Sequence, residues 1–145
     1  MEEEKEKISL PLARTYQSSE PTNSYKAIDG IKCNDYQACT CTHTESGPPH
    51  WWAVEFPQAS MVKAVSIVNR GDCCSERLRD FNIRVGFLLE NGANPFCRRN
   101  VGILTAKEVM FECDELVLGK YLFIESNVSD DLTICELEVY GELFF

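Results

Sequence analysis

Eight cysteines in a chain of 145 residues constrain this sequence more than any other feature. Such a high, even number in a short chain is typical of oxidised, extracellular proteins whose loops are tied by disulfides. Cys73 and Cys74 are adjacent, so their Cα atoms lie ~3.8 Å apart across a trans peptide, which is below the usual disulfide separation. Bonded to each other they would close a small strained ring, and such strain persists where a surrounding site fixes it. We therefore expect function in the segment from Arg70 to Arg77.

The length predicts one domain that can bury a real core. We place a charged, disordered tail at residues 1–8 and a single domain at residues 9–145. The 14 basic and 23 acidic residues give a net charge of −9, which argues against nucleic acid as a partner. No apolar run approaches the ~20 residues that cross a bilayer. The N-terminus lacks the apolar core of a signal peptide. Because the cysteine content favours an extracellular protein, we expect a secreted protein whose signal is absent from this sequence.

Period-two alternation of apolar residues predicts strands. Trp52, Val54 and Phe56 alternate with small or charged residues, and Phe81, Ile83 and Val85 form a second such series. Further β-rich runs cover residues 61–68, 120–125 and 136–140. Turn-forming spacers such as residues 90–95 separate them, and only residues 24–30 suggest a helical turn. This pattern favours an all-β sandwich or barrel.

Five segments together resemble the F-type lectins, or fucolectins, the fucose-binding branch of the discoidin-like (coagulation factor V/VIII C-type) domains: Lys26–Gly30, Cys41–Glu45, Trp51–Val54, Asn69–Leu78 and Cys135–Gly141. The family signature is a histidine, twenty-six residues, Arg-x-Asp, four residues, then arginine or lysine. His43, Arg70, Asp72 and Arg77 meet it in full. The resemblance covers about residues 15–141 and implies a jelly-roll β-sandwich of antiparallel strands with disulfide-tied loops.

The chemistry of these residues suits a neutral deoxysugar, which offers vicinal hydroxyls on one edge and an apolar methyl. Arg70 and Arg77 supply donors that stay charged at any physiological pH, and Asp72 is placed to orient a guanidinium. His43 adds one directed N–H. In the family the joined adjacent cysteines lie against the sugar ring, which implies a contact role for Cys73 and Cys74. Tyr36 is our candidate for an apolar wall facing the fucose methyl.

The resemblance also implies four disulfides: Cys73–Cys74, Cys41–Cys135, Cys97–Cys113 and an additional pair, Cys33–Cys39. From the sequence alone eight cysteines allow 105 connectivities. An alternative for a reducing compartment is zinc bound by Cys33, Cys39, Cys41 and His43. Their spacing lacks the paired C-x2–4-C knuckle of structural zinc sites.

A structural calcium ion is implied as well. Asp29 and Glu136 match its side-chain ligands and offer hard oxygen donors. Backbone carbonyls of Lys26, Ile31, Thr40 and Cys135 would complete the site, although Lys26 and Ile31 stand where the family leads us to expect asparagine. For Asp29-Gly30 a plain turn is the alternative.

Other interpretations of the same residues stay open. Arg70-Gly71-Asp72 is an adhesion motif, so the alternative function is a same-fold domain that binds protein or membrane surfaces through its loops. Trp51 and Trp52 suggest a stacking platform, but in a strand one ring faces inward and the other outward. His50 has no assigned role. Asn127-Val128-Ser129 is a glycosylation acceptor motif.

Catalysis has little support in the sequence. Asp72 and Glu76 lie beside two arginines that would lower their pKa values and spoil a general acid, and no catalytic motif is present. We therefore predict no enzyme but a lectin for terminal α-L-fucose on glycans, acting in innate immune recognition or agglutination. Agglutination requires several sites per particle, so the domain would have to form homo-oligomers for that role.

Overall fold

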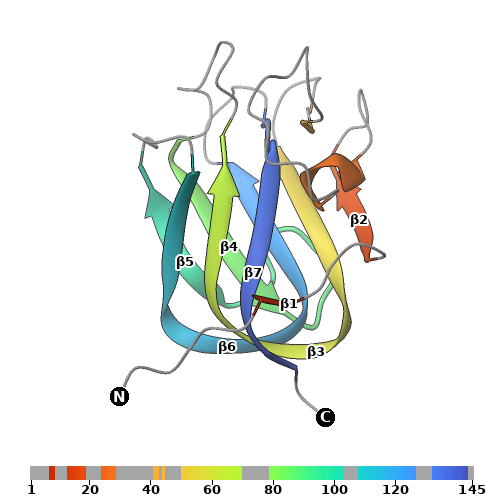
Figure 1. The fold of residues 1–145 in the computed structure, drawn as a ribbon, viewed down its shortest axis with the longest axis vertical. Helices are drawn as coiled ribbons and strands as arrows, with labels where there is room; N and C mark the ends of the chain where they lie inside the picture. Colours follow the sequence, from red (N-terminus) through yellow and green to blue (C-terminus); the bar gives the residue numbers. More distant parts are fainter. Residues whose placement is uncertain are drawn as a thin grey trace.

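The computed structural model describes residues 7–8, 13–18, 24–28, 41–42, 44, 50–69, 79–102, 108–126 and 132–143. These residues form seven strands and one short 3-10 helix (Figure 1). In chain order they are β1 (Lys7–Ile8), β2 (Arg14–Gln17), η1 (Ser24–Ile28), β3 (Trp51–Val68), β4 (Phe81–Gly86), β5 (Phe96–Val101), β6 (Glu108–Ser126) and β7 (Glu136–Leu143). The predicted all-β class and the helical turn after residue 24 are confirmed.

Two strands are much longer than the rest: β3 has 18 residues and β6 has 19. Both curve at the lower end of the molecule in Figure 1 and continue into a second layer. The first part of β3 pairs with the end of β6, as in Trp52 opposite Ile124, and its last part pairs with the beginning of β6, as in Val65 opposite Phe111. The register shifts between Glu55 and Ser60, a stretch that contains Pro57, which has no N–H to give to a ladder.

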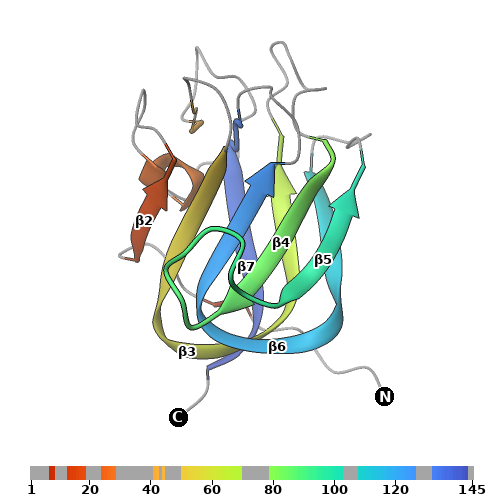
Figure 2. The same cartoon turned by 180° about the vertical axis from the view of Figure 1, so that it is seen from behind.

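The strand pairs define two layers, and every pair is antiparallel. One layer contains β2, the first part of β3, the end of β6, β4 and β5; the other contains β1, β7, the last part of β3 and the beginning of β6 (Figures 1 and 2). Between them lie fully buried side chains such as Trp52, Phe56, Ile83, Ile124 and Ile67. The disulfide Cys97–Cys113 ties β5 to β6, so this predicted pair and the predicted β-sandwich are confirmed.

The N-terminal boundary differs from the prediction. We placed residues 7 and 8 in a disordered charged tail, but they form β1 and pair with Tyr140 and Val139 of β7. The apolar side chain of Ile8 is 3% exposed, and Lys7 forms an ion pair with Glu138. The sheet therefore has an additional short strand, which the charged residues 1–7 had led us to predict as a tail.

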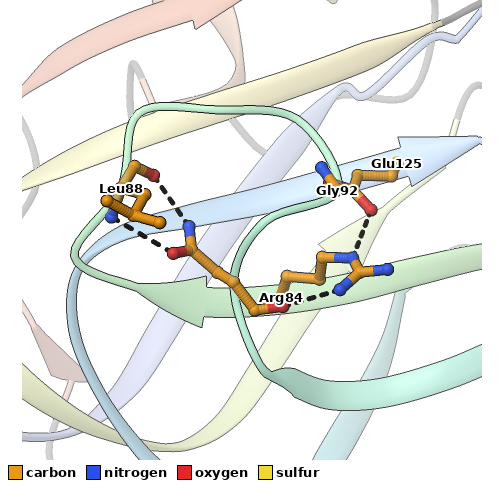
Figure 3. A network of polar contacts seen from close by, with 5 residues as sticks. Arg84, Leu88, Gly92 and Glu125 are labelled. Atoms are coloured by element: carbon orange, nitrogen blue, oxygen red, sulfur yellow. Dashed lines mark hydrogen bonds and ion pairs between the residues drawn. The ribbon is translucent and has the colours of Figure 1, made fainter.

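The residues between β4 and β5 form a loop, the 87–95 loop, which folds back across the outer face of β6 (Figure 2). At its tip the N–H of Gly92 donates to Oε2 of Glu125 at 2.5 Å. The other oxygen of that carboxylate accepts from Nε of Arg84 at 2.5 Å, and Nη1 of Arg84 donates to the carbonyl of Asn94 (Figure 3). These three hydrogen bonds of Arg84, Gly92, Asn94 and Glu125, which we call the clamp, hold the loop against β4 and β6.

Asn94 shapes the 87–95 loop from inside. Its side-chain amide donates to the carbonyl of Leu88 at 2.8 Å and accepts from the N–H of the same residue at 3.1 Å. The side chain occupies the space where a Cβ on Gly86 would be, so glycine is required there for close packing. The loop presents Phe87, Leu88 and Leu89 to solvent.

Candidate functional site

The predicted sugar contacts all lie outside the described residues: Tyr36, His43, Arg70, Asp72, Cys73, Cys74 and Arg77. So do Asp29, Ile31 and Thr40 of the implied calcium set, and the cysteines of the predicted pairs Cys33–Cys39 and Cys73–Cys74. The structure does describe the residues that adjoin the signature in the chain. Thr42 and Thr44 flank His43, and Asn69 immediately precedes Arg70. These neighbours show how the base of the candidate site is built.

Residues 132–135, which we call the bridge segment, join these two parts of the signature. Cys135 forms a disulfide with Cys41, with an S–S length of 2.06 Å, across a sequence separation of 94. Its N–H donates to the carbonyl of Val68 at 2.9 Å. Cys41, Val68 and Cys135 form a buried cluster of their own. The predicted disulfide Cys41–Cys135 is confirmed, and it brings the chain before His43 next to the chain before Arg70.

Two threonines bind the bridge segment in the same way. The N–H of Thr42 donates to the carbonyl of Ile134 at 2.8 Å, and Oγ1 of Thr42 accepts from the N–H of Ile134 at 3.0 Å. Thr44 repeats this pattern with Leu132 at 3.0 and 2.9 Å. Both threonine side chains are buried, as are Leu132 and Ile134. Four hydrogen bonds thus fix the residues on both sides of His43.

His50, a residue without a predicted role, lies in the same buried network. Its imidazole Nδ1 is 2.8 Å from Oγ1 of Thr44, and the residue is 1% exposed. Its carbonyl accepts from the N–H of Ser126, the last residue of β6, at 2.9 Å. His50 therefore connects the threonine beside His43 to the end of the sandwich core.

The helix η1 is fixed to the sheet by polar contacts of its first residue. The indole Nε1–H of Trp52 donates to the carbonyl of Ser24 at 2.8 Å, and the hydroxyls of Thr15 and Ser24 lie 2.7 Å apart. Trp52 is buried, whereas Trp51 is partly exposed and packs on Phe123 with ring centroids 5.4 Å apart. One ring therefore faces the core and the other the sheet surface, as predicted.

Tyr16, on β2, is a residue near η1 whose pKa is shifted from its ordinary value. The hydroxyl of Tyr16 donates to Oε1 of Glu55 at 3.1 Å. Burial raises the pKa of this phenol above its ordinary value of 10.0, and the carboxylate of Glu55 raises the pKa further, while Arg14 opposes the rise. Tyr16 therefore remains a hydrogen-bond donor throughout the neutral range.

Part of the implied calcium set lies within the described residues. Glu136 is the first residue of β7, opposite Val68 in the register, and is 4% exposed. Its Oε1 is a buried oxygen, and Glu136 makes at least one polar or electrostatic interaction within the part of the chain that the structure describes. The helix η1, which carries Lys26, packs against β7 (Figure 1). Within the described ranges, no three His, Cys, Asp or Glu side chains are grouped to bind a metal.

Comparison with known proteins places this geometry in a family. Residues 26–122 match the F5/F8 type C family described as "NedA-like, galactose-binding domain". Fucolectin-5 of Anguilla japonica is 40% identical over 116 residues, which cover 78% of this chain and 61% of the relative. The fucolectin of Anguilla anguilla is 35% identical over 124 residues, which cover 84% of this chain and 77% of the relative. The chain belongs to the fucolectin, or F-type lectin, family.

Solved structures agree with this membership. An F-lectin from the serum of the striped bass, Morone saxatilis, superposes with a TM-score of 0.84 at 32% identity, covering 93% of this chain and 48% of that one. A fucose-binding module of Streptococcus pneumoniae gives a TM-score of 0.81 at 25% identity, covering 98% of this chain and 99% of the module. The discoidin-like fold implied by the resemblance is confirmed. This fucolectin-family chain spans less than two thirds of the length of Fucolectin-5.

Sequence reasoning missed the supporting residues of this fucolectin-family site: Thr42, Thr44, His50 and the bridge segment. One signal was present, because Thr42 and Thr44 alternate around His43 as in an extended chain. The partner of that extended piece lies about ninety residues further along the sequence. No local pattern reveals such a partner, so it needed the folded structure.

Proposed function

We propose that this chain binds terminal α-L-fucose on glycans through His43, Arg70, Asp72 and Arg77. Arg70 and Arg77 would donate hydrogen bonds to sugar hydroxyls, and Asp72 would orient a guanidinium. The joined Cys73 and Cys74 would contact the sugar ring, with Tyr36 beside the methyl group. This assignment carries the family signature, residue by residue, onto the matching positions of this sequence.

The observation that supports the proposal best is the bridge segment. A neutral sugar makes few strong contacts, so a binding site gains affinity when its donors are fixed before the ligand arrives. Thr42 and Thr44 beside His43, and Val68 two residues before Arg70, all hydrogen-bond to residues 132–135. Both parts of the signature thus begin from one rigid base.

A glycan array tests the ligand class. Signals confined to fucosylated glycans would support the proposal, whereas signals for galactose without fucose would instead favour the ligand in the description of the matched family. Adhesion to cells with no glycan signal would contradict the proposal and favour the adhesion function of Arg70-Gly71-Asp72.

Arg77→Ala tests the site. We expect it to abolish measurable fucose binding in titration calorimetry, because it removes a donor that no other residue of the signature replaces. Arg99→Ala is the matched control: Arg99 is an exposed arginine of β5 that stacks on Phe96, with its guanidinium carbon 4.1 Å from the ring centroid. Undiminished affinity in Arg77→Ala, with circular dichroism unchanged, would refute the assigned site.

We also propose a structural calcium ion bound by Asp29, Glu136 and the carbonyls of Lys26, Ile31, Thr40 and Cys135. Glu136 is a buried carboxylate at the start of β7, and its oxygen donors are of the kind that suits Ca²⁺. The ion would link η1 to the start of β7. Calcium should raise the melting temperature of EDTA-treated protein, and Glu136→Gln should remove most of that rise. An equal rise in both proteins would contradict the assignment.

The remaining features of the proposal concern the context of binding. We propose a secreted protein that binds without catalysing a reaction, and that forms homo-oligomers if it agglutinates cells. The described residues contain no helix of the length and hydropathy needed to cross a membrane. None of the described cysteines is free, which agrees with an oxidising environment. Mass measurement in solution by light scattering tests the oligomer.

A further inference from the structure

A buried histidine next to a predicted ligand contact requires an explanation beyond packing. His50 immediately precedes β3, and its carbonyl accepts a hydrogen bond from the N–H of Ser126. Its ring is aimed at Thr44, the residue that follows His43. The backbone of His50 is therefore anchored to β6, and its side chain contacts the segment that carries the signature histidine.

The hydrogen bond between Thr44 and His50 can run in either direction, because the tautomer of the ring decides which atom donates. Oγ1 of Thr44 accepts the N–H of Leu132 at 2.9 Å, so the single proton of the hydroxyl is available for a different acceptor. In the part of the chain that the structure describes, Nδ1 of His50 at 2.8 Å is the atom placed to accept it. The neutral imidazole then carries its own proton on Nε2.

This arrangement orients the threonine hydroxyl. When its proton points at Nδ1, the hydroxyl oxygen has a lone pair directed at the N–H of Leu132. Thr44 then makes both of its hydrogen bonds to the bridge segment, one through its N–H and one through Oγ1. Thr42 makes the same pair of bonds with Ile134, but the structure gives no histidine contact for it. Among the described residues, Thr44 thus has a histidine contact that is not given for Thr42, which instead follows the disulfide-bonded Cys41.

We infer that His50 is a positioning residue of the sugar site: it orients the Thr44 hydroxyl and thereby fixes the chain that carries His43 against the bridge segment. The inference rests on the proposed function for the identity of the ligand. It assigns His50 no contact with the sugar. Its role is to hold a donor-bearing segment in the geometry that binds.

A spectroscopic measurement tests the contact without any sugar. The chain contains two histidines, so long-range ¹H–¹⁵N correlation spectra are simple to assign with His43→Ala as a reference. We expect Nδ1 of the neutral His50 ring to show the shift of an unprotonated nitrogen and Nε2 that of a protonated one. A protonated Nδ1 would overturn the inference.

Affinity measurements test the positioning role with isosteric pairs. His50→Asn keeps an oxygen acceptor near the place of Nδ1, whereas His50→Leu has a similar shape and no acceptor. We expect His50→Leu to weaken fucose binding at least about tenfold and His50→Asn to stay within about threefold of the parent. Equal affinities in the two variants would overturn the inference.

A second pair keeps the test decisive if the His50 variants fold poorly. Thr44→Ser retains the hydroxyl and Thr44→Val removes it, so only the valine variant should lose affinity. Ser66→Ala is the control for general destabilisation, because it removes a buried hydroxyl that donates to Oε2 of Glu108 at 2.9 Å. Its affinity should match the parent at a temperature where all variants are folded. Valine and serine variants with equal affinity would contradict the role.

The two proposals fail in different ways. If the parent does not bind fucose, or if Arg77→Ala binds like the parent, the proposed function is wrong, while the His50 spectrum still decides the hydrogen-bond assignment. If Arg77→Ala abolishes binding and His50→Leu does not weaken it, the fucose site stands and the positioning role is wrong.

Discussion

Two irregular parts of this molecule are fixed to the same sandwich by different means. Cys41, Thr42 and Thr44 are bound to the bridge segment by a disulfide and by threonine side chains that pair with backbone groups. The 87–95 loop is fixed by the buried pair of Arg84 and Glu125 and by the side chain of Asn94, with no covalent link.

The two regions also differ in sequence distance. Asn94 and Leu88 are six residues apart and Arg84 and Glu125 are 41 apart, so less entropy is lost when these pairs meet than when still more distant residues do. Cys41 and Cys135 are 94 residues apart, and bringing such distant segments together costs more in the unfolded chain. A covalent bond therefore supports the base of the candidate sugar site, whereas polar contacts suffice for the loop. Perturbing each region should separate binding from stability.

The largest effect is expected from the disulfides. On the chain-entropy relation, removing Cys41–Cys135 as a double alanine variant should lower the free energy of unfolding by about 4.7 kcal/mol, and removing Cys97–Cys113 by about 3.1 kcal/mol. Urea unfolding of the two variants measures this order. Fucose affinity should fall with the first variant and persist with the second. The reverse order of stabilities, or lost affinity in both, would contradict the comparison.

A smaller effect is expected from the clamp on the 87–95 loop. Glu125→Gln leaves the guanidinium of Arg84, a side chain only 17% exposed, without its counter-charge. Breaking such a buried pair should cost about 3 kcal/mol. Hydrogen exchange at the N–H of Gly92 should accelerate, because that donor loses a carboxylate acceptor. Fucose affinity should not change, since the hydrogen bonds given for this loop among the described residues involve Arg84, Leu88 and Glu125 and not the bridge segment.

Glu142→Gln provides the matched control for that clamp. Glu142 forms an ion pair with Lys63 at 3.3 Å, but its side chain is 64% exposed. Exposed pairs contribute about 0–1 kcal/mol, so the control should be nearly neutral. If Glu125→Gln were equally neutral, the 87–95 loop would not depend on its buried charges.

The smallest effect is expected at Tyr16, whose contact with Glu55 lies outside both regions. Its pKa in the folded protein is raised above 10.0, so its contribution is fully present below about pH 10 and is lost as the pH rises through the raised value. Tyr16→Phe should lower stability by about 1 kcal/mol at neutral pH, and the difference from the parent should shrink at higher pH. A constant difference in urea unfolding across that range would contradict the shift.

The sequence predicted the parts of this fold whose residues alternate cleanly. The alternating runs at residues 52–56 and 81–85 and the β-rich run at residues 61–68 are all strands. The runs at residues 52–56 and 61–68, predicted separately, belong to one long strand, β3. β5 and the first half of β6 were not predicted, because polar residues interrupt their apolar pattern and the side chains of Glu112, Asp114 and Glu115 are exposed.

For the candidate site, the sequence supplied the signature and the resemblance supplied the partner cysteines. Cys41–Cys135 and Cys97–Cys113 could not have been chosen from spacing among 105 connectivities. The roles of Thr42 and Thr44 depend on Leu132 and Ile134, and the role of His50 depends on Thr44; these residues meet only after folding. A hydroxyl beside an extended segment has many potential partners in the sequence, and only the tertiary structure selects one.

The long strands β3 and β6 have a consequence for how the protein unfolds. Each contributes one part to each layer, and the two are paired along most of their length. Neither layer can therefore unfold on its own, because β3 and β6 supply paired segments to both layers and unfolding one layer would disrupt the strands of the other. Heat or denaturant should thus melt both layers in one cooperative step, and the base of the candidate sugar site, anchored to the ends of these strands, should keep its form until that step.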